Sequence, residues 1–207
     1  RALLRTKSSH IQEISRIFTE GVVTICEGQA LDKEFETRHR VHVNEYLMMI
    51  EKKTGKLVSI AAQLGALIGN ASISDLEALR RYGEHVGRAF QIQDDLLDIV
   101  ADEKEFGKTI GGDLVEGKKT FLLLEALRRA KGEQKKMLQR IFTNGGVPKK
   151  QVPTFRLIYE ETGAMDSAKK RIESDITEAK NQLTSLTPSI ARETLRWMTD
   201  KLLNRKF

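Results

Sequence analysis

Two neighbouring stretches of the chain combine carboxylates with lysines and could bind a metal ion together with a polyphosphate. The first reads FQIQDDLLD over residues 90–98 and contains Asp94, Asp95 and Asp98. The second runs over residues 107–118 and places Lys108 and Lys118 among glycines. Carboxylates indicate a hard cation such as Mg²⁺, which proteins often hold with one or two carboxylates plus substrate phosphates. Lysines beside them indicate that a phosphorylated ligand binds with the cation.

Helical spacing should bring these polar side chains together. Residues three and four apart share a helix face, so Gln91, Asp94 and Asp98 should stack, with Asp95 at the flank. Carboxylates that converge repel one another unless a cation lies between them. A solvated helix face is the alternative explanation of an Asp-Asp pair. Three aspartates inside an apolar segment, where Asp is unfavourable in a helix, favour the metal–phosphate interpretation.

The same stretches resemble the second aspartate-rich region of the trans-isoprenyl diphosphate synthases. The matching letters are F-Q-I-Q-D-D-L-L-D, then G-K-T-I-G-G-D, then G-K-K-T-F. Upstream, residues 27–32 (EGQALD) resemble the family's G-Q-x-x-D helix ending. Residues 46–57 resemble its Y-x-x-x-I-x-x-K-T segment. Essentially the whole chain can be laid onto the later part of the family.

One motif of the family has no counterpart. No D-D-x-x-D sequence precedes Gln29, and the chain begins with Arg1 instead of Met. We therefore expect the chain to start just downstream of the first aspartate-rich motif, as a fragment. The 207 residues alone should then be inactive. A natural relative that has lost half of its site is the alternative.

The resemblance implies a trans-prenyltransferase that uses Mg²⁺. Such an enzyme condenses an allylic prenyl diphosphate with isopentenyl diphosphate, gives a longer trans-prenyl diphosphate and releases diphosphate. Asp94 would be the main ligand of one Mg²⁺, with Asp95 and Asp98 as further or water-mediated ligands. The resemblance also implies a homodimer.

The resemblance assigns the substrate contacts as well. Lys53 and Lys108 would contact the allylic diphosphate, and Lys118 matches a family lysine nearby. Thr54 and Gln91 would line the reacting end, where a hydroxyl and an amide dipole stabilise positive charge. Gln29 and Asp32 would face the same cavity.

The hydrophobic pattern predicts an all-α protein. Apolar stripes with helical period cover residues 11–25 and 155–183, and only three prolines interrupt the chain. A capping box at Ser74 should open one helix, Thr187-Pro188 should open the last, and a break should fall near Thr54-Gly55. With the resemblance, we expect a single domain over residues 1–207. It should be an antiparallel helical bundle of the isoprenoid synthase type around a central cavity, incomplete at its N-terminus.

Composition narrows the choice of partners. The net charge of +6, from 35 basic and 29 acidic residues, is too mild to predict nucleic-acid binding and suits an anionic substrate. The sequence contains no run of eighteen apolar residues, so it predicts no transmembrane segment. The single cysteine cannot form an internal disulfide, which fits a reducing compartment, so we expect a cytoplasmic protein.

Two alternative functions stay open. The first is a non-catalytic subunit that pairs with an active synthase in a heteromeric enzyme. The second is a terpene cyclase of the same helical class. The usual second metal motif of cyclases mixes Asn, Ser or Thr with Glu, and the spacing of Asp94, Asp95 and Asp98 argues against it.

Overall fold

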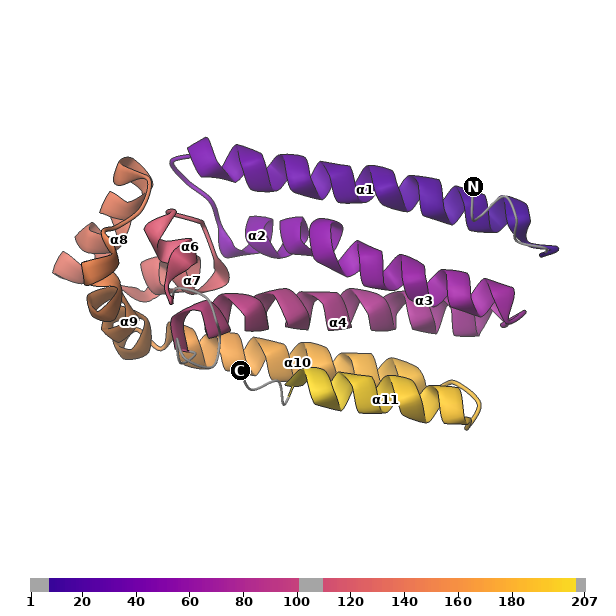
Figure 1. The fold of residues 1–207 in the computed structure, drawn as a ribbon. Coiled ribbons are helices and arrows are strands. Elements are labelled where there is room, and N and C mark those ends of the chain that lie inside the picture. The colour runs from indigo at the N-terminus through magenta and orange to yellow at the C-terminus, as the bar shows by residue number, and fades with distance from the viewer. Residues whose placement is uncertain (1–7, 101–109, 204–207) are drawn as a thin grey trace.

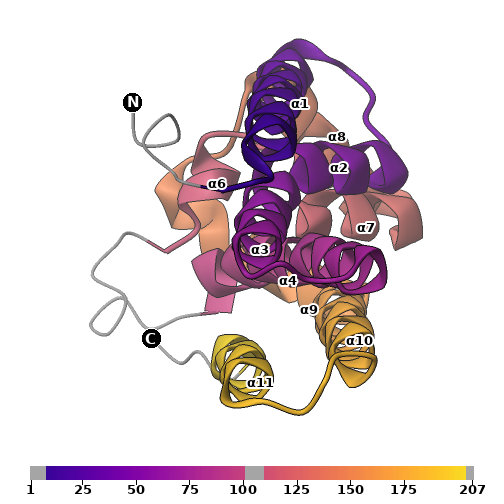
Figure 2. The same cartoon turned by 90° about the vertical axis from the view of Figure 1, so that its right-hand side faces the viewer.

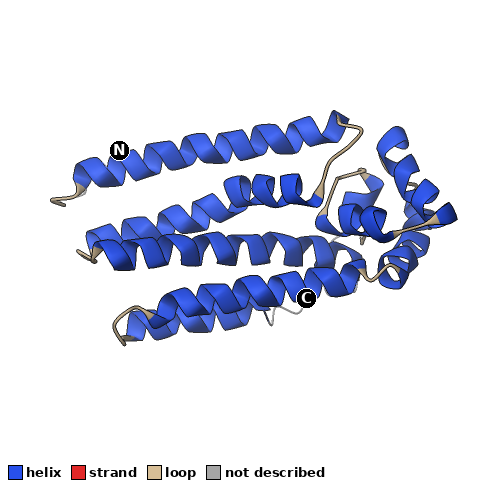
Figure 3. Ribbon diagram, turned by 180° about the vertical axis from the view of Figure 1, so that it is seen from behind, coloured by secondary structure: helices blue, strands red, loops and turns tan. Residues whose placement is uncertain are grey.

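The computed structural model describes residues 8–100 and 110–203, and every regular element within these ranges is helical (Figures 1 and 3). The elements in chain order are α1 (Ile11–Thr37), α2 (Val43–Ile50), a π-helical turn (Glu51–Gly55, hereafter the π-turn), α3 (Lys56–Ile68), α4 (Ile73–Val100), α6 (Gly112–Val115), α7 (Phe121–Arg129), α8 (Gly132–Asn144), a 3₁₀ turn (Lys149–Gln151), α9 (Val152–Glu161), α10 (Ala164–Thr184) and α11 (Ile190–Leu203). The predicted all-α architecture is confirmed.

The long helices lie side by side and run in alternating directions. Figure 1 shows α1, the α2–α3 pair, α4, α10 and α11 stacked in this order, with α6–α9 grouped at one end. The end-on view of Figure 2 places α4 in the middle of the bundle, and α4 packs against both α3 and α10. Because α4 carries the aspartate-rich segment, the central helix positions the predicted site.

The largest hydrophobic cluster lies at the end of the bundle where the short helices gather. It joins α2, the C-terminal half of α4 and α7–α10 through fully buried side chains such as Ile92 and Leu122. A smaller cluster of Ile14, Ile17, Ile60 and Leu67 joins α1 to α3. Burying the apolar face of α4 fixes the helix rotation and therefore the direction in which its polar face points.

The structure corrects three predicted helix boundaries. The break expected near Gly55 is wrong, because the helix continues from α2 to α3 through the π-turn. The helix expected to open at Ser74 begins at Ile73, since the Ser72 hydroxyl accepts a hydrogen bond from the Asp75 N–H at 3.1 Å. The last helix begins at Ile190, after Ser189.

Two predicted apolar stripes also differ in detail. On α1 the buried face runs through Ile14, Ile17 and Gly21, so Phe18 and Val22 are exposed. The long stripe over residues 155–183 is divided into α9 and α10 by Gly163, whose φ of +69° ends one helix and starts the next. No helix within the described ranges is long and apolar enough to cross a bilayer.

Candidate functional site

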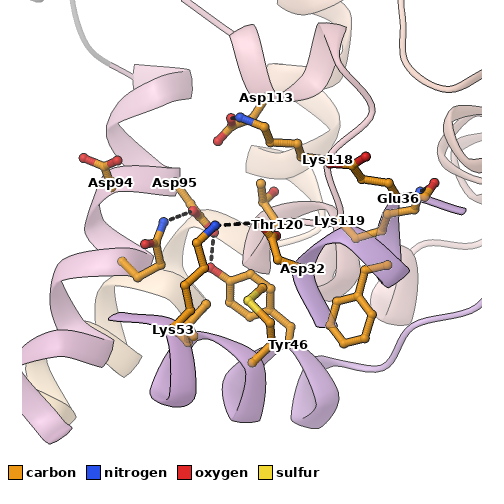
Figure 4. Close-up of a pocket in the computed structure, with 14 residues that line it drawn as sticks. Asp32, Glu36, Tyr46, Lys53, Asp94, Asp95, Asp113, Lys118, Lys119 and Thr120 are labelled. Atoms are coloured by element: carbon orange, nitrogen blue, oxygen red, sulfur yellow. Dashed lines mark hydrogen bonds and ion pairs between the residues drawn. The ribbon is translucent and has the colours of Figure 1, made fainter. Parts of the chain in front are cut away.

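A polar pocket of about 170 Å³ lies where α1, α2, the π-turn, α4 and the segment around α6 and α7 meet (Figure 4). Its lining combines three lysines with five acidic side chains over an apolar floor. The lining residues are Asp32, Phe35, Glu36, Tyr46, Met49, Ile50, Lys53, Gln91, Asp94, Asp95, Asp113, Lys118, Lys119 and Thr120. Such a mixture of fixed cations and carboxylates suits a metal-bound polyphosphate better than an apolar ligand.

Asp95 lies deepest and is bound by the protein itself. Asp95 is only 4% exposed. Its carboxylate accepts hydrogen bonds from the Tyr46 hydroxyl at 2.5 Å, the Phe121 backbone N–H at 3.1 Å and the Gln91 amide at 3.3 Å. Figure 4 shows the contact between Asp95 and Tyr46. Burial raises the pKa of Asp95 to about 7. Because Phe121 is the first residue of α7, this carboxylate caps a helix and joins α2, α4 and α7.

Asp98 holds the glycine-rich segment. Its carboxylate accepts a hydrogen bond from the backbone N–H of Asp113 at 3.1 Å, at the start of α6. Burial, together with the nearby Asp113 carboxylate, raises the pKa of Asp98 to about 6. Asp113 in turn accepts a hydrogen bond from Lys118 Nζ at 2.7 Å. The position of Lys118 at the pocket therefore depends on a chain of contacts that begins on α4.

The π-turn supplies the polar groups on the opposite wall. Lys53 Nζ donates to the Asp32 carboxylate of α1 at 2.5 Å. The Thr54 hydroxyl donates a hydrogen bond to the Gln91 amide oxygen at 3.0 Å, and the Gln91 amide nitrogen donates one to the Asp95 carboxylate at 3.3 Å. A π-turn inserts one extra residue into a helix, and such insertions are frequent at functional sites. Here it directs Lys53 and Thr54 toward groups on two other helices.

Sequence reasoning gave no role to several groups that the structure places in the pocket. Lys119 Nζ donates to the Glu36 carbonyl oxygen at 2.7 Å, at the C-terminal end of α1, and burial lowers the pKa of Lys119. Asp113 and Tyr46 belong to the matched sequence motifs, but the motifs alone gave them no role. The position of Asp113 directly after two glycines, inside a stretch that already contained lysines, was the signal available for it.

The predicted site residues fall into three groups. The pocket is lined by five of them: Lys53, Gln91, Asp94, Asp95 and Lys118. Two more, Thr54 and Asp98, are hydrogen-bonded to groups of the pocket wall.

The remaining two predicted residues are not placed in the pocket. Gln29 is exposed on α1 and does not belong to the described pocket lining, whereas Asp32, predicted with it, does. Lys108 lies outside the described residues.

The donor set fits a hard divalent cation that is bound together with phosphate. Asp94 and Asp113 line one pocket, and the nearby Asp113 carboxylate helps burial to raise the pKa of both Asp95 and Asp98, so a cation nearby would relieve this repulsion. Within residues 8–100 and 110–203, no three His, Cys, Asp or Glu side chains already form a metal cluster. An ion here would complete its coordination with water and phosphate oxygens, as Mg²⁺ commonly does.

Comparisons with known proteins identify the family and the fold. A sequence model of the family described as polyprenyl synthetase matches residues 2–160. The chain is 39% identical over 206 residues to a short chain isoprenyl diphosphate synthase of Methanothermobacter thermautotrophicus. The matched region covers 99% of this chain and 63% of that relative. It is 33% identical to the crystal structure of geranylgeranyl pyrophosphate synthetase from Pyrococcus horikoshii, with a TM-score of 0.92 over 99% of this chain and 63% of that one.

A third relative carries ligands. The crystal structure of polyprenyl synthase from Caulobacter crescentus, complexed with calcium and isoprenyl diphosphate, is 27% identical. Its TM-score is 0.86, and the match covers 94% of this chain and 60% of that one. The chain thus spans less than two thirds of the length of these relatives. The predicted isoprenoid synthase fold is confirmed, and with a family match over most of its residues the chain belongs to the polyprenyl synthetase family.

Proposed function

We propose that the protein, in its natural full-length form, is a Mg²⁺-dependent trans-prenyltransferase. It condenses an allylic prenyl diphosphate with isopentenyl diphosphate to give a longer trans-prenyl diphosphate and releases diphosphate. The observation that carries this proposal is the meeting of Asp94, Lys53 and Lys118, from three separate segments, in one polar pocket. The similarity to isoprenyl diphosphate synthases supports it, as does the relative that binds calcium and isoprenyl diphosphate.

The lysines of the chain bind and orient the allylic diphosphate in this proposal. Lys53 and Lys118 contact phosphate oxygens. Lys108, which lies outside the described residues, is predicted to do the same. Their charges neutralise the negative charge that grows on the leaving diphosphate, which is where electrostatic stabilisation lowers the barrier most. Thr54 and Gln91 present a hydroxyl and an amide dipole to the allylic carbon, and Gln29 stays a predicted part of the cavity wall.

The carboxylates divide the metal binding between them. Asp94 would hold one Mg²⁺ directly. Asp95 and Asp98 would act through water, because N–H and O–H groups of the protein already occupy their carboxylates. When bound, the ion supplies Lewis-acid stabilisation of the leaving diphosphate. A homodimer, a cytoplasmic location and a single domain over residues 1–207 stay predictions.

A chain-elongation assay tests the proposal. The full-length protein is incubated with Mg²⁺, isopentenyl diphosphate and dimethylallyl, geranyl or farnesyl diphosphate. The wild type should form a longer prenyl diphosphate, and Asp94→Asn should reduce its formation by about 100-fold. Asp75→Asn is the matched control, since Asp75 lies on the same helix about 28 Å away along its axis. A folded wild type that elongates no primer would refute the proposal and favour the non-catalytic subunit.

A further inference from the structure

A buried ionic network connects α10 to the π-turn and lies outside the pocket. Its centre is Asp175 of α10, whose side chain is only 4% exposed. The Asp175 carboxylate accepts hydrogen bonds from Arg88 Nη2 at 2.6 Å and Arg171 Nε at 2.8 Å, and His85 Nδ1 lies 2.8 Å away. More positive groups surround this carboxylate than are needed to neutralise it.

Arg88 carries the network onward to the π-turn. While one side of its guanidinium binds Asp175, Nη1 donates to the Glu51 carboxylate at 2.5 Å. The side chain of Arg88 is 14% exposed, whereas that of Glu51 is 45% exposed. Glu51 is the first residue of the π-turn, two residues before Lys53 and three before Thr54. A single guanidinium thus ties the turn that carries two predicted substrate contacts to a buried carboxylate on another helix.

The backbone of the π-turn is confined on two sides. A Cβ added to Gly28 of α1 would lie 2.5 Å from the backbone nitrogen of Lys53. A Cβ added to Gly87 of α4 would lie 2.4 Å from the Cα of Gly55. Two helices therefore touch the turn directly through glycines, and Arg88 follows Gly87 in the chain. The bond between Arg88 and Glu51 adds a further restraint on the turn to this packing.

We expect this network to contribute little to stability. An ion pair with a half-exposed glutamate contributes little to the free energy of unfolding. A buried ionic cluster is often no more stable than an apolar one of the same size, because the charges must be desolvated. A π-turn is rare and is frequent at functional sites, so the direction of its side chains matters here. The bidentate geometry of arginine suits a link that sets orientation.

We propose that Arg88, anchored on Asp175, is a positioning residue that fixes the π-turn through Glu51 and so directs Lys53 and Thr54 at the allylic diphosphate. The inference rests on the proposed function, and it assigns no substrate contact to Arg88 itself. It separates the residues that bind the substrate from those that hold the binding turn in place.

The test compares Glu51→Gln with Arg171→Gln in the full-length protein. Glu51→Gln removes the negative charge from the link to the turn and so weakens it, and it leaves Arg88 paired with Asp175. Arg171→Gln removes another Asp175 partner on α10 and leaves the link intact. For Glu51→Gln we expect kcat/KM for the allylic diphosphate to fall about tenfold, mainly through KM, with the unfolding temperature within about 3 °C of the wild type. Arg171→Gln should keep kcat/KM within about twofold of the wild type while losing at least as much stability. Arg88→Lys, which keeps the charge but not the two-sided geometry, should behave like Glu51→Gln.

Backbone amide exchange of residues 51–55 provides a readout that does not depend on activity. Glu51→Gln should accelerate exchange of these amides about tenfold relative to Arg171→Gln. If the wild type elongates no primer, the proposed function fails, and the exchange comparison still decides whether the network holds the turn. Wild-type kinetics and exchange in Glu51→Gln would overturn the inference. An equal loss of kcat/KM in Arg171→Gln would also overturn it, since it would show a general effect on α10.

Discussion

Replacing Gly28 by alanine should displace the π-turn and misplace Lys53. The added Cβ would lie 2.5 Å from the backbone nitrogen of Lys53 and 2.8 Å from its Cα, whereas ordinary van der Waals contacts begin at 3.4 Å. Both partners are backbone atoms, so no flexible side chain can move aside. The two helices must therefore separate by about 0.9 Å at this point.

Two opposing terms set the effect of Gly28→Ala on stability. Overpacking of this kind costs about 1–3 kcal/mol of unfolding free energy. Alanine in place of glycine inside a helix returns about 1 kcal/mol. The net loss should be about 0–2 kcal/mol. The effect on activity should be larger, because a displacement of about 1 Å in a binding group can reduce the rate 100-fold. We expect kcat/KM for the allylic diphosphate to fall about 10- to 100-fold.

Gly65→Ala supplies the matched control. Gly65 also lies inside a helix, α3, but a Cβ at this position would meet nothing within 4 Å. This variant should gain about 0.5–1 kcal/mol of stability and keep its activity. Urea unfolding and steady-state kinetics of the two full-length variants measure both effects. A Gly28→Ala enzyme with wild-type kinetics, or equal losses in both variants, would refute the reasoning from close packing.

Three further predictions follow from other contacts. Lys53→Gln should lower kcat/KM for the allylic diphosphate about 100-fold in the elongation assay, whereas Lys52→Gln, which removes a cation from the same turn but not from the pocket lining, should not. Hydrogen bonds from Arg128, Ser167 and Arg129 lower the pKa of Glu125 to about 2. The ionised Glu125 should therefore contribute about 2–3 kcal/mol to the free energy of unfolding above pH 4.5, and this contribution should be lost as the pH falls toward 2. Urea titrations between pH 7 and pH 3 should show this loss in the wild type and a flatter dependence in Glu125→Gln. Gly163→Ala, at a φ of +69°, should lower the thermal unfolding midpoint by about 3 °C, equivalent to about 1 kcal/mol.

Local sequence patterns predicted those features of the fold that depend on residues close together in the chain. The helix that carries Gln91, Asp94 and Asp98 follows from spacing alone, because helix periodicity needs only neighbouring residues. The π-turn did not follow, since Gly55 has the local signature of a helix break. Gly55 instead lies within the helix and admits the close approach of Gly87, a partner 32 positions along the chain. A glycine that ends a helix and one that admits another helix look alike until the partner is known.

The aspartate-rich segment shows the same limit within a single motif. Its three aspartates have similar sequence surroundings but different partners. Asp94 lines the pocket, Asp95 caps α7 and binds Tyr46, and Asp98 holds the start of α6. Two of the three partners of Asp95, Phe121 and Tyr46, lie 26 and 49 positions away, beyond any local pattern.

These contacts change how substitutions in the motif should be interpreted. Because Asp98 binds the backbone of Asp113, which in turn binds Lys118, one carboxylate of α4 sets the position of a pocket lysine. Replacing Asp95 or Asp98 would therefore disturb the lysine segment and α7 even if neither side chain ever contacted a metal ion. Loss of activity in those variants cannot by itself establish metal ligation. Asp94, which lines the pocket, should therefore be tested separately from Asp95 and Asp98, whose carboxylates hold neighbouring segments in place.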